Sequence, residues 1–123
     1  MKIHVYEITD TIVSGSTDFG NINIKWEGEK PDIGKDYEVE LDIDGFLIWG
    51  EDITLSHTES NSIVCDGDSI LLYGVLESVD ADGYSILRIG SNVIPFLGQG
   101  NSMDIGTKIK IRIDSISASP VFY

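Results

Sequence analysis

Apolar side chains recur at every second position along most of the chain. Between 37 and 43 they alternate with carboxylates, and between 109 and 113 three isoleucines alternate with basic residues. A period of two places apolar residues on one face of a β-strand, whereas an amphipathic helix needs a period of 3.6. No convincing helical stripe occurs anywhere in the sequence. The pattern therefore predicts an all-β protein.

Asp-Gly pairs divide the apolar segments. They stand at 44–45, 66–67 and 82–83, and this dipeptide readily takes the positive φ angles of tight hairpin turns. The spacing predicts a hairpin joining 71–79 to 84–89 and another joining 38–43 to 46–49. The segments between turns number about eight to nine, so the expected fold is a small antiparallel barrel or sandwich.

Two parts of the chain resemble one another. Asp32-Ile33-Gly34 and the strand that follows parallel Asp104-Ile105-Gly106 and its strand, and IHVY at 3–6 parallels ILLY at 70–73. We expect a single domain over 1–123. Within it, an internal repeat would pair two β-meanders, 3–50 and 70–123, joined by the connector 51–69.

The repeat inverts charge. The carboxylates at 36, 38 and 40 align with the cations at 108, 110 and 112, while the apolar face is kept. Opposite charges across paired strands favour pairing. The alignment therefore predicts that these two strands are neighbours, with Glu38 and Glu40 facing Lys108, Lys110 or Arg112.

Composition adds a strong electrostatic bias. The 123 residues include 21 acidic and 8 basic ones, for a formal net charge of −13, and 41% are hydrophobic. Such a chain can bury a core, and its field repels nucleic acid and anionic membrane while attracting cationic partners. The single cysteine, expected to be a buried strand thiol, excludes a disulfide framework. The absence of a signal core or long apolar run indicates a cytoplasmic protein.

Carboxylates gather around the two tryptophans. The stretch 36–52 holds seven acids in seventeen residues, and no basic strand is left to neutralise those near its end. Tryptophan is enriched at binding hot spots, although its usual place in a small β protein is the core. The predicted partner-binding residues are Asp42, Asp44, Trp49, Glu51 and Asp52, with Trp26, Glu27 and Glu29 as a second group.

Catalytic and metal chemistry lack a motif. Glycine falls at the wrong positions for a calcium-binding EF-hand loop in each Asp-Gly segment, and GQG at 98–100 lacks the lysine of a phosphate-binding loop. His4 and His57 fit no zinc site or catalytic triad. The sequence indicates a protein that is not an enzyme and needs no metal or cofactor.

Two resemblances bear on function. The segment YGVLESVDADGYSILRIGSNVIPF followed by DIGTKIKIRI, within 70–114, is similar in rhythm to small OB-like barrels, which often bind oligonucleotides through basic grooves that this chain lacks. As a single acidic domain with stretches such as KWEGEKPD and DIDGFLIWGED, the chain resembles bacterial immunity proteins of polymorphic-toxin and contact-dependent inhibition systems. That resemblance implies an inhibitor that masks a basic toxin, such as a nuclease.

Two other functions remain open. The chain could be a β-sandwich structural or adaptor subunit that binds its own copies or a larger assembly, and its oligomeric state is not determined by the sequence. It could also be a carbohydrate-binding module that uses Trp26 or Trp49 as a sugar platform, although such modules are usually exported.

Overall fold

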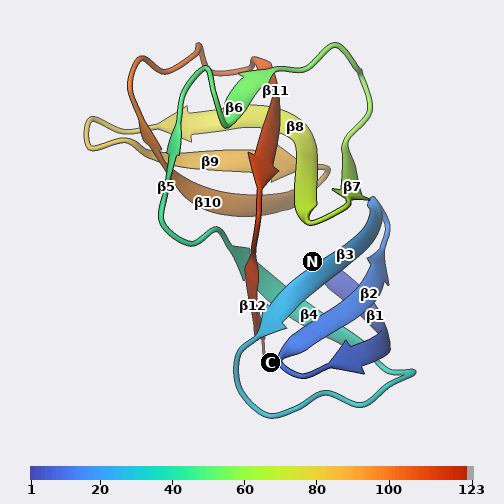
Figure 1. Cartoon of the computed structure of the whole chain (residues 1–123). Helices are drawn as coiled ribbons and strands as arrows, with labels where there is room; N and C mark the ends of the chain where they lie inside the picture. Colours follow the sequence, from blue (N-terminus) through green and yellow to red (C-terminus); the bar gives the residue numbers. More distant parts are fainter. Residues whose placement is uncertain (122–123) are drawn as a thin grey trace.

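The structure, a computed structural model, describes residues 1–121 and folds into two barrel-like β-sheets, one above the other (Figure 1). None of these residues is helical, so the predicted all-β fold is confirmed. The strands number twelve rather than eight or nine, and two pairs of them are parallel.

The lower barrel is closed by five strands in the order β1-β2-β3-β12-β4. The pairing of β3 with β12 is parallel, and the other pairings are antiparallel. Its strands are β1 (Lys2–Thr9), β2 (Ile12–Thr17), β3 (Gly20–Trp26), β4 (Asp36–Asp42) and β12 (Ser117–Pro120).

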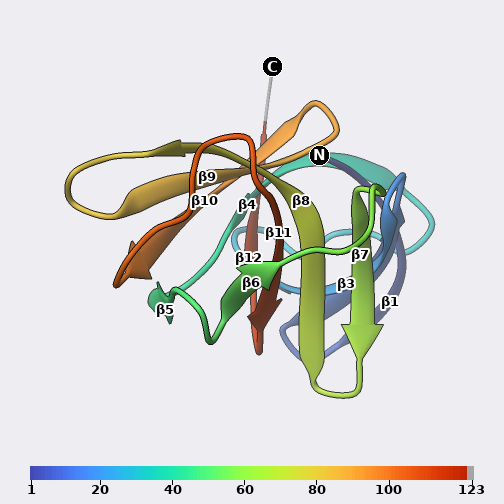
Figure 2. The ribbon, with the colours of Figure 1, turned by 90° about the horizontal axis from the view of Figure 1, so that it is seen from above.

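The upper sheet contains seven strands, six of them in the order β5-β10-β9-β8-β11-β6. The strand β7 pairs with β8 outside this path and lies beside β3 of the lower barrel (Figure 2). Its strands are β5 (Phe46–Ile48), β6 (Ile53–Leu55), β7 (Ser62–Asp66), β8 (Ser69–Val79), β9 (Tyr84–Ile89), β10 (Asn92–Gln99) and β11 (Lys108–Ile113).

Each sheet contains strands from the other part of the chain: β5 and β6 follow the first four strands but belong to the upper sheet, and β12 follows β11 but belongs to the lower barrel. After β4 the chain leaves the lower barrel, and β5 and β6 pair with β10 and β11 in the upper sheet. After β11 the chain descends, and β12 pairs with β3 and β4 (Figure 1). The two crossovers, 43–45 and 114–116, therefore run in opposite directions between the barrels and tie the halves together.

The two halves also share a local arrangement. The N–H of Gly34 donates to the carbonyl of Val5 at 2.7 Å, and the N–H of Gly106 donates to that of Leu76 at 2.8 Å. Both glycines have φ near +90°, which suits a residue without a Cβ, and in both halves the contacted strand shifts register directly after this contact. Val5 thus corresponds to Leu76, whereas the sequence alignment paired it with Leu72. The duplication itself stays a prediction.

The apolar residues of both barrels form one continuous core, made mostly of isoleucine, leucine and valine. The inward residues of β4 and β11 belong to it, as their alternation predicts. Because the core runs through both sheets, the two barrels bury their apolar side chains together. Removing those side chains from water is the main favourable term in the fold.

The turn predictions are confirmed at two Asp-Gly pairs and wrong at the third. The β8–β9 hairpin joins the predicted segments, and Asp66-Gly67 turns between β7 and β8. Asp44-Gly45 does not form a hairpin, because β4 pairs with β1 and β12 while β5 pairs with β10. Gly45 has a φ of +73°, and it lets the chain turn from one barrel into the other.

The predicted charge ladder is also wrong. The strands β4 and β11 lie in different sheets, where β4 pairs with β1 and β12 and β11 pairs with β6 and β8. The amino group of Met1 contacts the Glu38 carboxylate at 3.0 Å, and Lys2 lies 3.4 Å from Asp36. Alternating charge marks a solvent-facing strand, but it does not specify the neighbour. Cys65 is exposed on β7, not buried as expected.

Candidate functional site

The predicted partner-binding residues fall in two separate places. Trp26, Glu27 and Glu29 stand at the end of β3 and in the loop after it, below the lower barrel. The other five extend from the end of β4 through the first crossover to the turn between β5 and β6. The structure therefore does not bring the two tryptophans into one site.

Trp26 is held by its own loop. Its indole N–H donates to the carbonyl of Glu29 at 2.7 Å, and its ring meets that of Tyr37 edge to face at 5.2 Å. The hydroxyl of Ser119 donates to the carboxylate of Glu27 at 3.0 Å. These contacts give the first group a structural role in closing the lower end of the barrel. The remaining exposed part of the Trp26 ring lines a pocket of about 160 Å³.

Asp42 and Asp44 lie where the two crossovers pass each other. Asp42 is exposed at the end of β4, directly across from Ser117 on β12. The hydroxyl of Ser117, itself buried, donates to the Asp44 carboxylate at 2.9 Å. This hydrogen bond joins the start of the upward crossover to the end of the downward one, so Asp44 has a structural partner as well as a surface position.

Asp52 closes the turn between β5 and β6. Its carboxylate accepts the N–H of Ile48 at 2.8 Å, while its own N–H donates to the carbonyl of Ile48 at 2.9 Å. Glu51, in the same turn, is exposed to solvent. The Ile48 N–H lies on the open edge of β5. Because the Asp52 carboxylate accepts this N–H, it protects the edge of the upper sheet against pairing with another strand.

The crossovers border an open cleft, which we call the crossover cleft. Its volume is about 350 Å³, and it is open to solvent. Its lining includes three carboxylates, one guanidinium and one aromatic side chain. Its lining residues are Asp44, Phe46, Leu47, Asp52, Arg112, Ile113, Asp114 and Ser115. Two of the predicted residues, Asp44 and Asp52, therefore share one acidic cleft, and Asp114 was missed by sequence reasoning.

Trp49 belongs to the core and not to the surface. Only 9% of it is exposed, its ring lies 5.9 Å from that of Phe96, and it packs on the backbone of Gly98. The aromatic ring beside the acidic cleft is Phe46, which is 54% exposed. The sequence did not predict that Phe46 is the exposed ring. Residues 46–49 are all apolar, so period-two alternation does not say which two of them face outward. Leu47 and Trp49 point inward, and Phe46 and Ile48 point outward.

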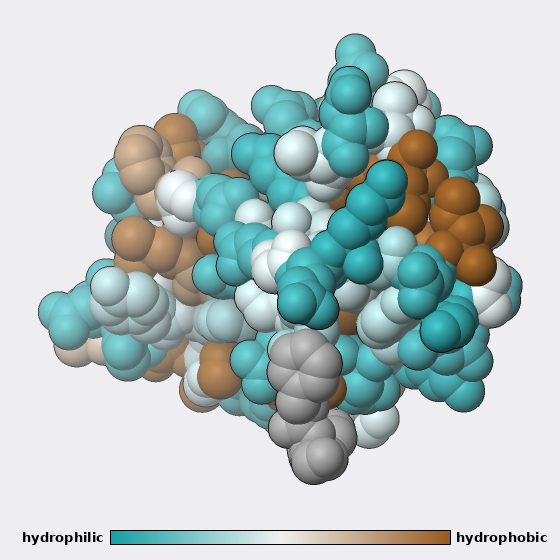
Figure 3. All heavy atoms as spheres, turned by 90° about the horizontal axis from the view of Figure 1, so that it is seen from below, coloured by the Kyte–Doolittle hydropathy of each residue, from teal (hydrophilic) through white to brown (hydrophobic). Residues whose placement is uncertain are grey.

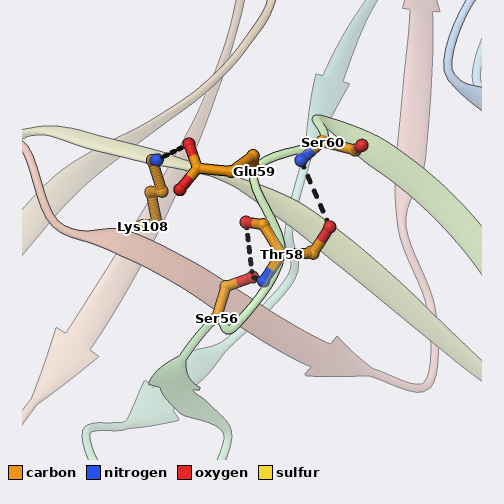
Figure 4. Close-up of polar contacts among 5 residues, drawn as sticks. All are labelled: Ser56, Thr58, Glu59, Ser60 and Lys108. Atoms are coloured by element: carbon orange, nitrogen blue, oxygen red, sulfur yellow. Dashed lines mark hydrogen bonds and ion pairs between the residues drawn. The ribbon is translucent and has the colours of Figure 1, made fainter.

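The loop that follows β6 is fixed to the upper barrel by one ion pair. The ammonium group of Lys108 on β11 meets the carboxylate of Glu59, and the two side chains point toward one another in Figure 4. Within the loop, the hydroxyls of Ser56 and Thr58 each accept an N–H two residues further on, at 3.2 Å. The cation of Lys108 thus serves the fold of its own barrel, not the acidic strand β4.

One carboxyl on the lower barrel has a shifted pKa. His4 Nδ1 lies 2.7 Å from Oδ1 of Asp36 on the neighbouring strand. This hydrogen bond lowers the pKa of the Asp36 carboxyl below its ordinary value, and Lys2 acts in the same direction. Both groups are half exposed on the outside of the barrel, so this hydrogen bond lies at the surface.

The lining of the crossover cleft consists mainly of carboxylate and apolar side chains. Within 1–121, no three His, Cys, Asp or Glu side chains are placed to hold a metal ion together. The acidic cleft has neither a histidine nor a cysteine in its lining. What the cleft can do chemically is attract cations through its carboxylates.

Comparisons with family models, with curated proteins and with solved structures gave no match for this chain. None of the described residues forms a helix of the length and apolar character that a membrane-spanning helix requires.

Proposed function

We propose that this chain is an acidic, non-catalytic protein-binding domain whose partner is a cationic protein. The observation that carries the proposal is the crossover cleft, which is lined by Asp44, Asp52 and Asp114, by one cation, Arg112, and by the exposed Phe46. A net charge of −13 extends the attraction well beyond this cleft. Such a field steers an oppositely charged partner into encounter and raises its association rate.

The biological form of this function that we favour is immunity to a bacterial toxin. In this form the domain masks the cationic active site of a basic toxin, such as a nuclease, by binding one to one in the cytoplasm. An inhibitor must capture a dangerous enzyme quickly, and electrostatic steering can raise association rates by about 10–10³ at low salt. The acidity of the chain and the carboxylates of the crossover cleft support this form.

The decisive experiment uses the protein encoded beside this chain in its genome. That neighbour, expressed alone, should arrest growth, and co-expression of this chain should restore growth. The purified pair should associate more slowly as salt rises, and the variant Asp42→Lys/Glu51→Lys should weaken the pair. A matched variant, Glu7→Lys/Asp18→Lys, makes the same change in net charge on β1 and in the β2–β3 turn, and it should bind nearly as wild type. A salt-insensitive association rate or an acidic partner would contradict the proposal.

One observation favours the alternative of a structural or adaptor subunit. The outer side of β5, β10 and β9 exposes several apolar residues, among them Phe46, Tyr84 and Val93. Such patches are common at interfaces between subunits. Light scattering of the purified chain over a range of concentrations tests this alternative, which requires a stable oligomer. No observation favours a carbohydrate-binding module. Trp49 is buried, and the indole N–H of Trp26 donates to the carbonyl of Glu29.

A further inference from the structure

An apolar row crosses three strands on the outside of the upper barrel. Phe46 on β5 lies opposite Leu97 on β10, and Leu97 lies opposite Tyr84 on β9. Residues in direct register across a sheet share a face, so these three side chains stand side by side. Phe46 is 54% exposed, Tyr84 is 62% exposed and Leu97 is partly buried between them. We call these three residues the outer row.

The outer row is part of a larger apolar face. Ile48 is exposed next to Phe46 along β5, and Val93 is exposed further along β10. Most of the molecular surface seen from below is hydrophilic, and hydrophobic side chains gather in separate areas of it (Figure 3). In an acidic protein, an exposed area of this kind is more consistent with a binding surface than with chance exposure.

Carboxylates stand at both ends of the outer row. Beyond Tyr84, the β8–β9 turn carries Asp80 and Asp82, and Asp80 accepts the N–H of Tyr84 at 3.0 Å. Beyond Phe46 lies the crossover cleft, with Asp44 and Asp52. Since neighbouring strands are about 4.8 Å apart, the row spans roughly 10 Å between its two acidic ends.

The charges at the two ends decide what can cover the row. A second copy of the chain would bring its own carboxylates against these, and an anionic membrane or nucleic acid would be repelled in the same way. On the outer face of the three strands that carry the row, β5, β9 and β10, the cation is Arg88, which already lies 3.5 Å from the carboxylate of Glu77. The complementary occupant is therefore apolar in the middle and basic at both ends.

We propose that the outer row is the anchor of the partner interface, and that it receives a protein segment carrying apolar side chains flanked by lysine or arginine. This inference rests on the proposed function and makes it more specific. Affinity comes from desolvated apolar and aromatic anchors, while exposed charges around them mainly set the association rate. The anchors are thus Phe46 and Tyr84, in place of the two tryptophans.

The partner binds the face of the sheet and not its edge. At the β5 edge, the N–H of Ile48 is taken by the Asp52 carboxylate, and the carbonyl of Ile48 accepts the N–H groups of Glu51 and Asp52. A strand approaching this edge would find both backbone hydrogen-bonding groups of Ile48 already occupied. Contact through side chains standing on the sheet does not need those groups.

Two labelled peptides of equal length and equal positive charge test the inference. The first alternates lysine with serine, and the second places leucine and isoleucine in the middle with lysines at both ends. Fluorescence anisotropy at low salt should show that the wild-type chain binds the second peptide about tenfold more tightly than the first, a difference typical of a small apolar anchor. The variant Phe46→Ser/Tyr84→Ser should bind both peptides equally.

The matched control is Ile33→Ser/Ile105→Ser, which removes two other exposed apolar side chains, 63% and 66% exposed, from turns outside the outer row. This control should keep the tenfold preference. Equal binding of the two peptides to the wild-type chain, or an undiminished preference in Phe46→Ser/Tyr84→Ser, overturns the inference but leaves the proposed function standing. If neither peptide binds the wild-type chain at low salt, the proposed function fails as well. If the wild-type chain forms a dimer and Phe46→Ser/Tyr84→Ser converts it to a monomer, the occupant of the outer row is a second copy of the chain and the inference is overturned.

Discussion

At the scale of single residues, the acidic run of 36–52 divides into carboxylates with different local partners. Asp36 pairs with His4, Asp44 accepts the hydroxyl of Ser117, and Asp52 caps the N–H of Ile48. Asp42 and Glu51 are exposed and accept no side-chain hydrogen bond from the described residues. Charge reversal for binding studies therefore belongs at Asp42 and Glu51, where it disturbs the fold least.

The contact between Trp49 and Gly98 gives a prediction about stability. A Cβ at Gly98 would collide with the indole Nε1 and with ring carbons of Trp49. Gly98→Ala should therefore lower the free energy of unfolding by about 1–3 kcal/mol, as overpacking of a dense core does. Urea unfolding measures this change.

The double variant Trp49→Phe/Gly98→Ala serves as the control for that contact. The smaller ring leaves room for the added methyl group, so the two substitutions together should cost less than the sum of their separate effects. Strictly additive effects would mean that the methyl group is accommodated in some other way and that the Trp49–Gly98 contact is not the limiting one.

The His4–Asp36 pair gives a prediction about pKa. Because the hydrogen bond from His4 holds the pKa of Asp36 below its ordinary value, His4→Gln should move that pKa upward, as measured by nuclear magnetic resonance titration of the Asp36 carboxyl. The control His57→Gln changes a histidine in the exposed loop 56–61 and should leave it unchanged. A carboxyl with a lowered folded pKa stabilises the fold above its ordinary pKa, and this contribution is lost as pH falls through the folded pKa.

At the scale of elements, the defining feature of the fold is that β12 completes the lower barrel while β5 and β6 complete the upper sheet. Neither the first four strands nor β8 to β11 can complete their barrel with the strand that follows them, because that strand lies in the other barrel. Each half of the chain is thereby required for the other. This differs from two barrels on a string, in which each unit folds with its own residues.

A cut in the loop 56–61 tests this dependence. Fragments 1–58 and 59–123 should each be largely unfolded alone and should fold when mixed in equal amounts. The first fragment lacks β12 of the lower barrel, and the second lacks β5 and β6 of the upper sheet. Circular dichroism and spectral dispersion in nuclear magnetic resonance would show the change. The loop is exposed, so the cut itself should be tolerated. The prediction would be contradicted by a fragment that folds alone, with its C-terminal strand paired within its own sheet.

The sequence predicted strands better than it predicted their neighbours. Alternation identified β4, β8, β9 and β11, since it depends only on which face of a strand meets the core. Pairing depends on contacts between distant segments, and neither the Asp-Gly pair at 44–45 nor the inverted charges of β4 and β11 carry that information. For the same reason Asp44 and Asp52 of the crossover cleft were among the predicted residues, while Asp114 and Phe46 were not.

At the scale of the whole molecule, an excess of negative charge acts against the folded state. A formal net charge of −13 on 123 residues makes the carboxylates repel one another across both barrels, and unfolding relieves that repulsion. Screening shortens the reach of these forces from about 30 Å at 0.01 M salt to about 3 Å at 1 M. Raising sodium chloride from 10 to 500 mM should therefore stabilise the protein by roughly 1–2 kcal/mol, seen as an increase in Tm of several degrees.

The variant Glu7→Lys/Asp18→Lys, whose net charge is smaller in magnitude, should gain less from the same salt. Choline chloride should act like sodium chloride, because screening does not depend on the identity of the cation. A Tm that falls with salt would show that ion pairs within the folded chain outweigh the repulsion among its carboxylates. A Tm that rises only with sodium would show specific binding of that cation to the folded chain rather than screening.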